Sequence, residues 1–447
     1  MITDTKIAAY NSMITSKRKY FIFKCIVFII LILPIFYEYF DILPKAAKYI
    51  LDISLVVYFV NTGGVITKMT SFAKLYKYYI ILILLITIIS LVIHEESIFF
   101  LLQESRRLIF PLLLYFIFSD IIESYPGVSV KIHKLLLTIV LIQVPLTVFQ
   151  TILFPYLKRY GVYVDAGHIN VIDIACGTMG AGGTSILGSW FPLVVIYLYD
   201  LKLLKHGLWL VISVFLINSG GGIILFFSVL LLLTFYSFGH GSVKNRFKAI
   251  SGMIVMIILI YFASGTDYFI ENTQRYERSF LMYNEVFIKK GAETFGGVQS
   301  HKIDRFNGHK FLRKKMDPYL YEPVLGLGFE FQQNDDKKPF GFKNDLNTVI
   351  AERGLLGLFL YVIFFLLLFK VVYDSLKQER HKAIFVKVLF FVVFFLGGLY
   401  NQSTRYFQIW LFVVYFIALL EHRSQYQFLL NFTSGYKHSN SRSQRRV

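Results

Sequence analysis

Long apolar segments recur along this chain and decide what it can fold into. They are about 15 to 22 residues long, the length of a helix that crosses a hydrocarbon layer of about 30 Å. Inside that layer the backbone must satisfy its own hydrogen bonds, so each segment is expected to be a helix. A membrane barrel would instead show alternating segments of about 10 residues, which are not seen here. The sequence therefore predicts an all-α polytopic membrane protein.

Twelve apolar segments can be placed, and they divide the chain of 447 residues into four parts. We expect nine transmembrane helices within residues 1–263 and a large periplasmic loop over 264–344. Three more transmembrane helices are expected within 345–422. A basic tail occupies 423–447, and its Ser-, Arg- and Asn-rich composition predicts disorder.

Three segments do not follow the simple pattern of one full-length apolar span. As one helix, residues 207–238 would measure about 48 Å, too long for one crossing, so the glycine run within 218–222 is expected to separate two helices. The fourth span is expected to be short, about residues 108–122, with Pro111 near its start. The glycine-rich stretch 161–189 has two open interpretations: it lines a groove for a lipid pyrophosphate, or it is a flexible connector.

The formal net charge of +18 arises from basic residues next to the apolar segments. With both termini in the cytoplasm, the inner segments contain 23 Lys and Arg, whereas the short outer loops contain 7. Cytoplasmic segments of membrane proteins carry such an excess. We therefore expect a multi-pass protein of the bacterial inner membrane with both termini cytoplasmic. No nucleic acid is needed to explain the charge.

The large loop is where chemistry is expected. It holds 13 Lys or Arg and 11 Asp or Glu, and its 15 Phe or Tyr residues predict a folded or interfacial loop. Around His309 the cations suit a phosphate or pyrophosphate, which Arg binds bidentately and Lys as a point charge. The alternative is an amphipathic helix whose charges face water, which we favour for the run that includes Lys314.

Motifs for nucleotide or metal chemistry are absent from the sequence. There is no Walker loop, no dinucleotide-binding glycine motif, no HExxH and no Asp-x-Asp pair. We therefore predict no cofactor and no metal ion.

A spaced set of residues links the loop to the next helix. Arg305 stands 21 residues before Gly326. The set continues with Gly326-Leu327-Gly328, then Asn344-Asp345, then Glu352-Arg353-Gly354-Leu355-Leu356-Gly357-Leu358. In order, spacing and membrane side this pattern resembles the signature of the O-antigen polymerase and ligase superfamily. Those proteins have a similar number of spans and a large periplasmic loop late in the chain.

The resemblance implies transfer of a glycan from an undecaprenyl-pyrophosphate donor at the periplasmic face. Two departures from the family pattern favour a polymerase over an O-antigen ligase, which would pass the glycan to lipid A core. Lys343 replaces a His that ligase members use, and Ser219-Gly220-Gly221 lacks an Arg. The expected partners are undecaprenyl-pyrophosphate-linked oligosaccharides, the lipid bilayer and a chain-length regulator. A transporter or flippase is the alternative without chemistry. Transporters usually carry ionisable residues in the middle of their spans, and this chain has few, which speaks against that alternative.

Such a reaction needs positive charge where the departing pyrophosphate gathers negative charge. Arg305 is the first candidate, Arg278 the second and Arg159 the third. The attacking hydroxyl can also require a general base, and Asp345 and Glu352 are the candidates. Seven residues apart, they would share a face of a helix.

The remaining candidates are assigned to substrate binding. They are His309 from the cationic segment and, through the resemblance, Gly326, Gly328, Asn344 and Arg353. For Glu352 and Arg353 an equal alternative is an ion pair that stabilises the start of the next helix.

Thiol labelling tests the predicted topology. In a chain with Cys25 and Cys176 replaced by Ala, single cysteines at Ser300 and Gln332 should react with a membrane-impermeant reagent in intact spheroplasts. A cysteine at Ser439 should react only after the membrane is opened. Labelling at Ser439 alone would invert the topology.

Overall fold

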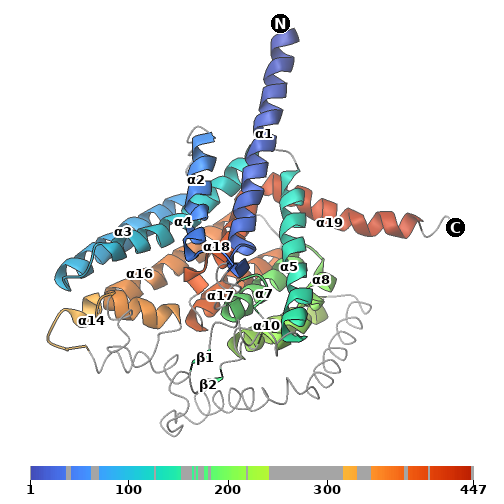
Figure 1. Cartoon of the computed structure of the whole chain (residues 1–447). Coiled ribbons are helices and arrows are strands. Elements are labelled where there is room, and N and C mark those ends of the chain that lie inside the picture. Colours follow the sequence, from blue (N-terminus) through green and yellow to red (C-terminus); the bar gives the residue numbers. More distant parts are fainter. Residues whose placement is uncertain are drawn as a thin grey trace.

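Helices form nearly all of the described part of this chain in its computed structural model (Figure 1). The structure describes residues 2–36, 42–61, 70–124, 127–152, 164–165, 168–169, 176–179, 183–217, 220–240, 316–329, 344–376, 381–400 and 403–443. The ninth predicted span and most of the predicted loop lie outside these ranges. Within them, the only strands are β1 (Val164–Asp165) and β2 (His168–Ile169), which pair antiparallel.

The helices fall into two groups along the chain. The first group is α1 (Ile2–Leu31), η2 (Lys45–Tyr49), α2 (Ile50–Asn61), α3 (Ser71–Ile93), α4 (Phe99–Ser124), α5 (Val128–Ile152), α7 (Gly183–Asp200), α8 (Leu204–Leu208), α9 (Leu210–Leu216) and α10 (Gly220–His240). The second is α14 (Glu322–Leu325), α16 (Asp345–Leu376), α17 (His381–Tyr400), η6 (Ser403–Arg405), α18 (Phe407–Glu421) and α19 (Arg423–Ser443).

Among the described residues, three helices, α3, α5 and α16, are long and apolar enough to cross a membrane. The 23 residues of α3 measure about 35 Å at 1.5 Å per residue. Large apolar side chains stay exposed along the bundle, among them Leu85, Val92 and Phe359, as suits a surface in contact with lipid. The structure supports the predicted helical membrane class, and the number of twelve spans stays a prediction.

Helix α18 lies at the centre of the bundle. Its residues from Ile409 to Leu420 are all buried, and it packs against α1, α4, α7, α16 and α19. A helix that is apolar on every side belongs inside other helices. The ring of Trp410 lies 5.5 Å from Tyr76 of α3 and 5.1 Å from Phe394 of α17. The surrounding helices are therefore positioned against one central element.

Polar contacts gather at the two ends of α18. Just before its start, Arg405 pairs with Glu352 of α16, and we call this side of the bundle the arginine end. At the other end, the Glu421 end, Glu421 accepts hydrogen bonds from Tyr115 and from the backbone of Phe72. The 15 residues of α18 separate the two ends by about 22 Å.

The beginning of the bundle and the start of α19 share the Glu421 end. Lys19 of α1 pairs with Asp120 of α4 at 2.9 Å, and Ser119 beside it contacts His422 at 2.7 Å. The helices α1 to α4 run alternately towards and away from this end, since Tyr58 near the end of α2 also bonds to Asp120. An alternation of this kind is what consecutive membrane crossings require.

Two predicted boundaries differ from those observed. Helix α4 begins at Phe99 and not near residue 108, because Glu104 and Arg107 are paired inside the fold and need no aqueous loop. Before the glycine run, α8 and α9 together cover only 204–216, less than the about 20 residues of a full crossing. A new helix does begin at Gly220, where the glycine run predicted a break.

The prediction of a disordered tail is wrong, because the described part of the tail forms α19. Figure 1 shows this helix leaving the bundle sideways. Its first half carries apolar side chains that composition averaged over the whole tail did not reveal. Tyr426 and Leu429 are buried, and α19 packs on α5, where Ser129 bonds to Gln425. Burial of these side chains offsets the entropy of ordering the segment.

Truncation of one buried side chain should release this helix. Leu429→Ala is expected to cost about 2–5 kcal/mol of local stability, because Leu429 is fully buried. Trypsin should then cut after Arg423 faster in inverted membrane vesicles. The exposed Gln427→Ala is the matched control and should cleave like the parent. Equal cleavage of all three proteins would show that α19 is not held by this contact.

Candidate functional site

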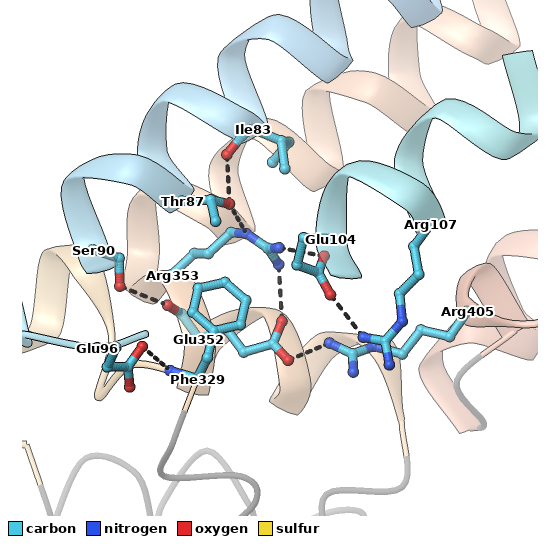
Figure 2. A network of polar contacts seen from close by, with 10 residues as sticks. All are labelled: Ile83, Thr87, Ser90, Glu96, Glu104, Arg107, Phe329, Glu352, Arg353 and Arg405. Atoms are coloured by element: carbon cyan, nitrogen blue, oxygen red, sulfur yellow. Dashed lines mark hydrogen bonds and ion pairs between the residues drawn. The ribbon is translucent and has the colours of Figure 1, made fainter. Parts of the chain in front are cut away.

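A buried arginine, Arg353, occupies the centre of the arginine end (Figure 2). It is brought there by the first part of α16 and lies against α3 and α4. Its two terminal nitrogens donate to Glu104 at 2.6 Å and to Glu352 at 2.9 Å, and Nε donates to Thr87 at 3.2 Å. The guanidinium also lies 5.0 Å from the ring centre of Phe329. Each nitrogen of the fork therefore has a partner, as a buried charge requires.

Each carboxylate then reaches a second arginine. The other oxygen of Glu104 accepts from Arg107 at 2.7 Å, and the other oxygen of Glu352 accepts from Arg405. The result is an alternating chain of three arginines and two carboxylates, which we call the arginine cluster: Arg107, Glu104, Arg353, Glu352 and Arg405. The cluster has one positive charge in excess.

The two outer arginines differ from the central one in exposure. Arg353 is 4% exposed, whereas Arg405 is 18% and Arg107 38% exposed. Burial alone would lower the pKa of Arg405, but the carboxylates of Glu352 and Glu104 raise it above its ordinary value. Arg405 therefore stays charged, and the positive charge in excess faces the rim of the cluster.

Glycines at two distant positions make this arrangement possible. Gly354 has φ +58°, and α16 is kinked there. Gly326 has φ +88°, and a Cβ on it would lie 2.6 Å from the carbonyl oxygen of Ala351. The backbone N–H of Leu327 donates to that same oxygen at 2.7 Å. The close approach of the two backbones needs glycine, and it fixes the start of α16 beside α14.

The end of α3 and the turn after it form hydrogen bonds to the backbone of these same two segments, 326–329 and the start of α16. His94 Nε2 donates to the carbonyl of Gly326 at 3.0 Å, and Ser90 Oγ donates to that of Glu352 at 3.3 Å. Glu96 accepts from the N–H of Phe329 at 2.8 Å. A Cβ on Gly328 would collide with the Glu96 carboxylate. Both glycines assigned to substrate binding thus have a structural reason in this fold.

Asp345 lies in a separate buried position at the start of α16. Its Oδ2 accepts from the N–H of Thr404 at 2.9 Å, with the Tyr361 hydroxyl at 3.5 Å. Its Oδ1 is buried and has no hydrogen-bond partner among the described residues. The segment 403–405 therefore connects both predicted bases: Thr404 contacts Asp345, and Arg405 contacts Glu352.

Asn344 forms the N-terminal boundary of α16. Its side-chain oxygen accepts from the N–H of Asn347 at 2.8 Å, the bond of a helix N-cap. This contact gives Asn344 a structural role next to the expected binding role.

Two pockets adjoin the arginine cluster and share Arg405 as part of their walls. The smaller, of about 150 Å³, is lined by Phe100, Gln103, Glu104, Arg107, Phe329, Glu352 and Arg405. The larger, of about 210 Å³, lies between the end of α1, the start of α2 and the start of α18. Among the described residues, no group of three His, Cys, Asp or Glu is placed to hold a metal ion.

The six predicted site residues that the structure describes come together. Gly326, Gly328, Glu352 and Arg353 share one set of contacts, and Asn344 and Asp345 lie at the start of α16. The ion pair proposed for Glu352 and Arg353 is present, as part of a larger cluster. The other four predicted residues lie outside the described residues: Arg159, Arg278, Arg305 and His309.

The interpretation of the sequence missed Glu104, Arg107 and Arg405 as site residues. A signal was present, because Glu104 and Arg107 stand immediately before an apolar run and Arg405 between two others. Ionisable residues so close to membrane segments are often functional. Their mutual pairing depends on the packing of α4 against α18 and α16, which no local pattern reveals.

No protein-family model and no curated protein matches this chain. The resemblance to the polymerase and ligase superfamily therefore stays an expectation.

Removal of the central arginine should destabilise the protein more than removal of an outer one. Arg353→Ala leaves Glu104 and Glu352 buried beside each other, at a cost of about 3–5 kcal/mol. Arg107→Ala removes a half-exposed partner from Glu104, which keeps Arg353. Thermal unfolding of the detergent-purified variants, followed by gel filtration, compares them. Similar loss in both variants would mean that Arg353 does not hold this end together.

Proposed function

We propose that this protein is a polysaccharide polymerase of the bacterial inner membrane. It joins undecaprenyl-pyrophosphate-linked oligosaccharide repeat units by metal-independent glycosyl transfer at the outer face. The observation that carries the proposal is the arginine cluster, which has an excess of positive charge and adjoins two pockets at one end of an apolar bundle. Residues of the superfamily-like motif, Glu352 and Arg353, are its centre.

The cluster suits the charge that such a reaction develops. The hydroxyl oxygen of the acceptor sugar forms a bond to the anomeric carbon of the donor, while the bond from that carbon to the pyrophosphate oxygen breaks. The departing pyrophosphate gains negative charge, which preorganised cations stabilise. Arg107 and Arg405 retain exposed surface for this purpose, and Arg305 of the loop remains the first candidate to complete the site.

The proton of the acceptor hydroxyl needs a destination, and Asp345 suits that role better than Glu352. Both oxygens of Glu352 are engaged by arginines, so neither is free to accept a hydrogen bond from the hydroxyl. Asp345 retains an oxygen without a partner among the described residues and lies next to the segment that carries Arg405. Glu352 then serves to position Arg353 and Arg405.

The orientation of the protein in the membrane follows from the distribution of its Lys and Arg residues. We assign the arginine end to the periplasmic face and the Glu421 end, with Lys19 and α19, to the cytoplasm. The predicted inner segments carry most of the loop Lys and Arg, in agreement with the positive-inside rule. Both termini are then cytoplasmic, and the large loop lies on the same side as the cluster.

The ligase and the transporter remain the competing functions, and a deletion strain separates all three. Loss of a polymerase should leave single repeat units on lipid A core. Loss of a ligase should leave long chains on undecaprenyl pyrophosphate, and loss of a flippase should hold repeats in the cytoplasmic leaflet. Gel analysis of the lipopolysaccharide, with lipid-linked glycans quantified in parallel, reads out each result. Long chains or retained repeats would replace the polymerase by the corresponding alternative.

Complementation of that strain tests the loop arginine. Arg305→Ala should abolish long chains at normal protein level, because loss of a preorganised donor costs about 100- to 1000-fold in rate. Arg305→Lys should give only short chains, since it lacks the planar fork. Lys314→Ala, assigned to a solvated face, is the matched control and should restore the full ladder. A full ladder with Arg305→Ala would move the role to Arg278.

A further inference from the structure

The larger pocket at the arginine end combines an apolar wall with three cations. Its apolar side is formed by α1, α2, α7 and α18, with Ile30, Leu51 and Phe407 among the lining residues. Its cations are Lys48, Arg106 and Arg405. A pocket of this composition is amphiphilic and suits a ligand with an apolar chain and an anionic head.

The cations of this pocket are only partly neutralised. Arg106 donates through Nε to both oxygens of Asp52, at 2.9 and 3.0 Å, and Arg405 pairs with Glu352. Lys48 contacts no carboxylate among the described residues, and its ammonium lies 5.2 Å from the ring centre of Tyr49. Three cations therefore face two carboxylates, and the remaining charge attracts an anion.

Arg106 is held in place in a way that leaves one of its terminal nitrogens free to donate to a ligand. The guanidinium lies 5.3 Å from the ring centre of Phe407 and 5.7 Å from that of Tyr49. Asp52 engages Nε, and the backbone oxygen of Lys48 lies 3.5 Å from one terminal nitrogen. The other terminal nitrogen contacts no acceptor among the described residues. Stacking on rings fixes an arginine for phosphate recognition at low entropic cost.

An apolar surface leads away from the pocket along α2. Ile53, Val56 and Val60 are between 62% and 75% exposed, on the helix that begins beside Lys48. In a bilayer this surface contacts acyl or isoprenoid chains. A chain lying against it would have its head group at the three cations.

We propose that this pocket binds the head group of a single-chain lipid pyrophosphate, with the chain along α2. The assignment rests on the proposed function, because the two substrates of such a polymerase are lipids of this class. The charged donors of Lys48, Arg106 and Arg405 around about 210 Å³ match the several phosphate oxygens of a pyrophosphate. Ile186 of α7, in the last part of the stretch 161–189, also lines the pocket.

Lipid binding by the full-length purified protein tests the pocket without any glycosyl transfer. Native mass spectrometry with undecaprenyl pyrophosphate, undecaprenyl monophosphate and phosphatidylglycerol would compare the three head groups. We expect the order pyrophosphate, monophosphate, phosphatidylglycerol. Each lost charge-assisted contact should weaken pyrophosphate binding about 10-fold or more.

Two variants separate binding from folding. Lys48→Gln changes an exposed side chain, and Arg106→Gln with Asp52→Asn removes a pair without leaving a lone carboxylate. Both should bind the pyrophosphate more weakly, at an unchanged gel-filtration profile. Lys77→Gln, an exposed cation in the part of α3 nearer the Glu421 end, is the matched control and should bind normally.

Equal affinity for phosphatidylglycerol would overturn the pyrophosphate assignment, and unchanged binding by both variants would overturn the site. The outcome is independent of the proposed reaction. Suppose that the protein binds pyrophosphate selectively, that both variants weaken this binding, and that the deletion strain shows a flippase phenotype. The lipid site would then be supported, and the polymerase function would be rejected.

Discussion

The arginine end depends on the neutralisation of one buried guanidinium. Moving an ion of this size into a medium of low dielectric costs several kcal/mol even after relaxation, so Arg353 has to be paired wherever it is buried. Glu104 from α4 and Glu352 from its own helix supply the two charges, and Thr87 of α3 supplies a hydroxyl oxygen as a further acceptor. The ends of three helices are thereby tied to one side chain. The pairing is directional, because the N–H groups of a guanidinium all lie in its plane and donate along it.

The path of the backbone follows from the same requirement. Glu352 and Arg353 are neighbours in sequence, and a kink directly after them lets both point into the bundle end while α16 continues as an apolar helix. Gly354 provides the kink, and Gly326 allows the 316–329 segment to lie against it. The spacing between these glycines is thus explained by a backbone contact between two segments. Their recurrence in a family-like motif does not by itself indicate substrate contact.

The charged groups at this end differ in how completely their atoms are paired. Glu352 has both oxygens in ion pairs, whereas Asp345 has one oxygen without a described partner. Arg353 is enclosed, whereas Arg107 and Arg405 reach pockets. Arg405 lies on the walls of both pockets, so a change there would alter both anion environments together. The inner members of the cluster hold the outer ones in position, as the proposed electrostatic role of Arg107 and Arg405 requires.

The sequence by itself determined the class of this protein, because an apolar segment of about 20 residues in a membrane has few solutions other than a helix. Through the resemblance it also grouped Gly326, Glu352 and Arg353, which the structure brings into contact. Only the tertiary structure decided the partner of Arg353, because Glu104 lies 249 residues away along the chain. It likewise decided that the first half of the tail is ordered, since Leu429 is buried only when α5 is packed beside it. Charge pairing and burial depend on distances between helices, and no pattern within one helix contains those distances.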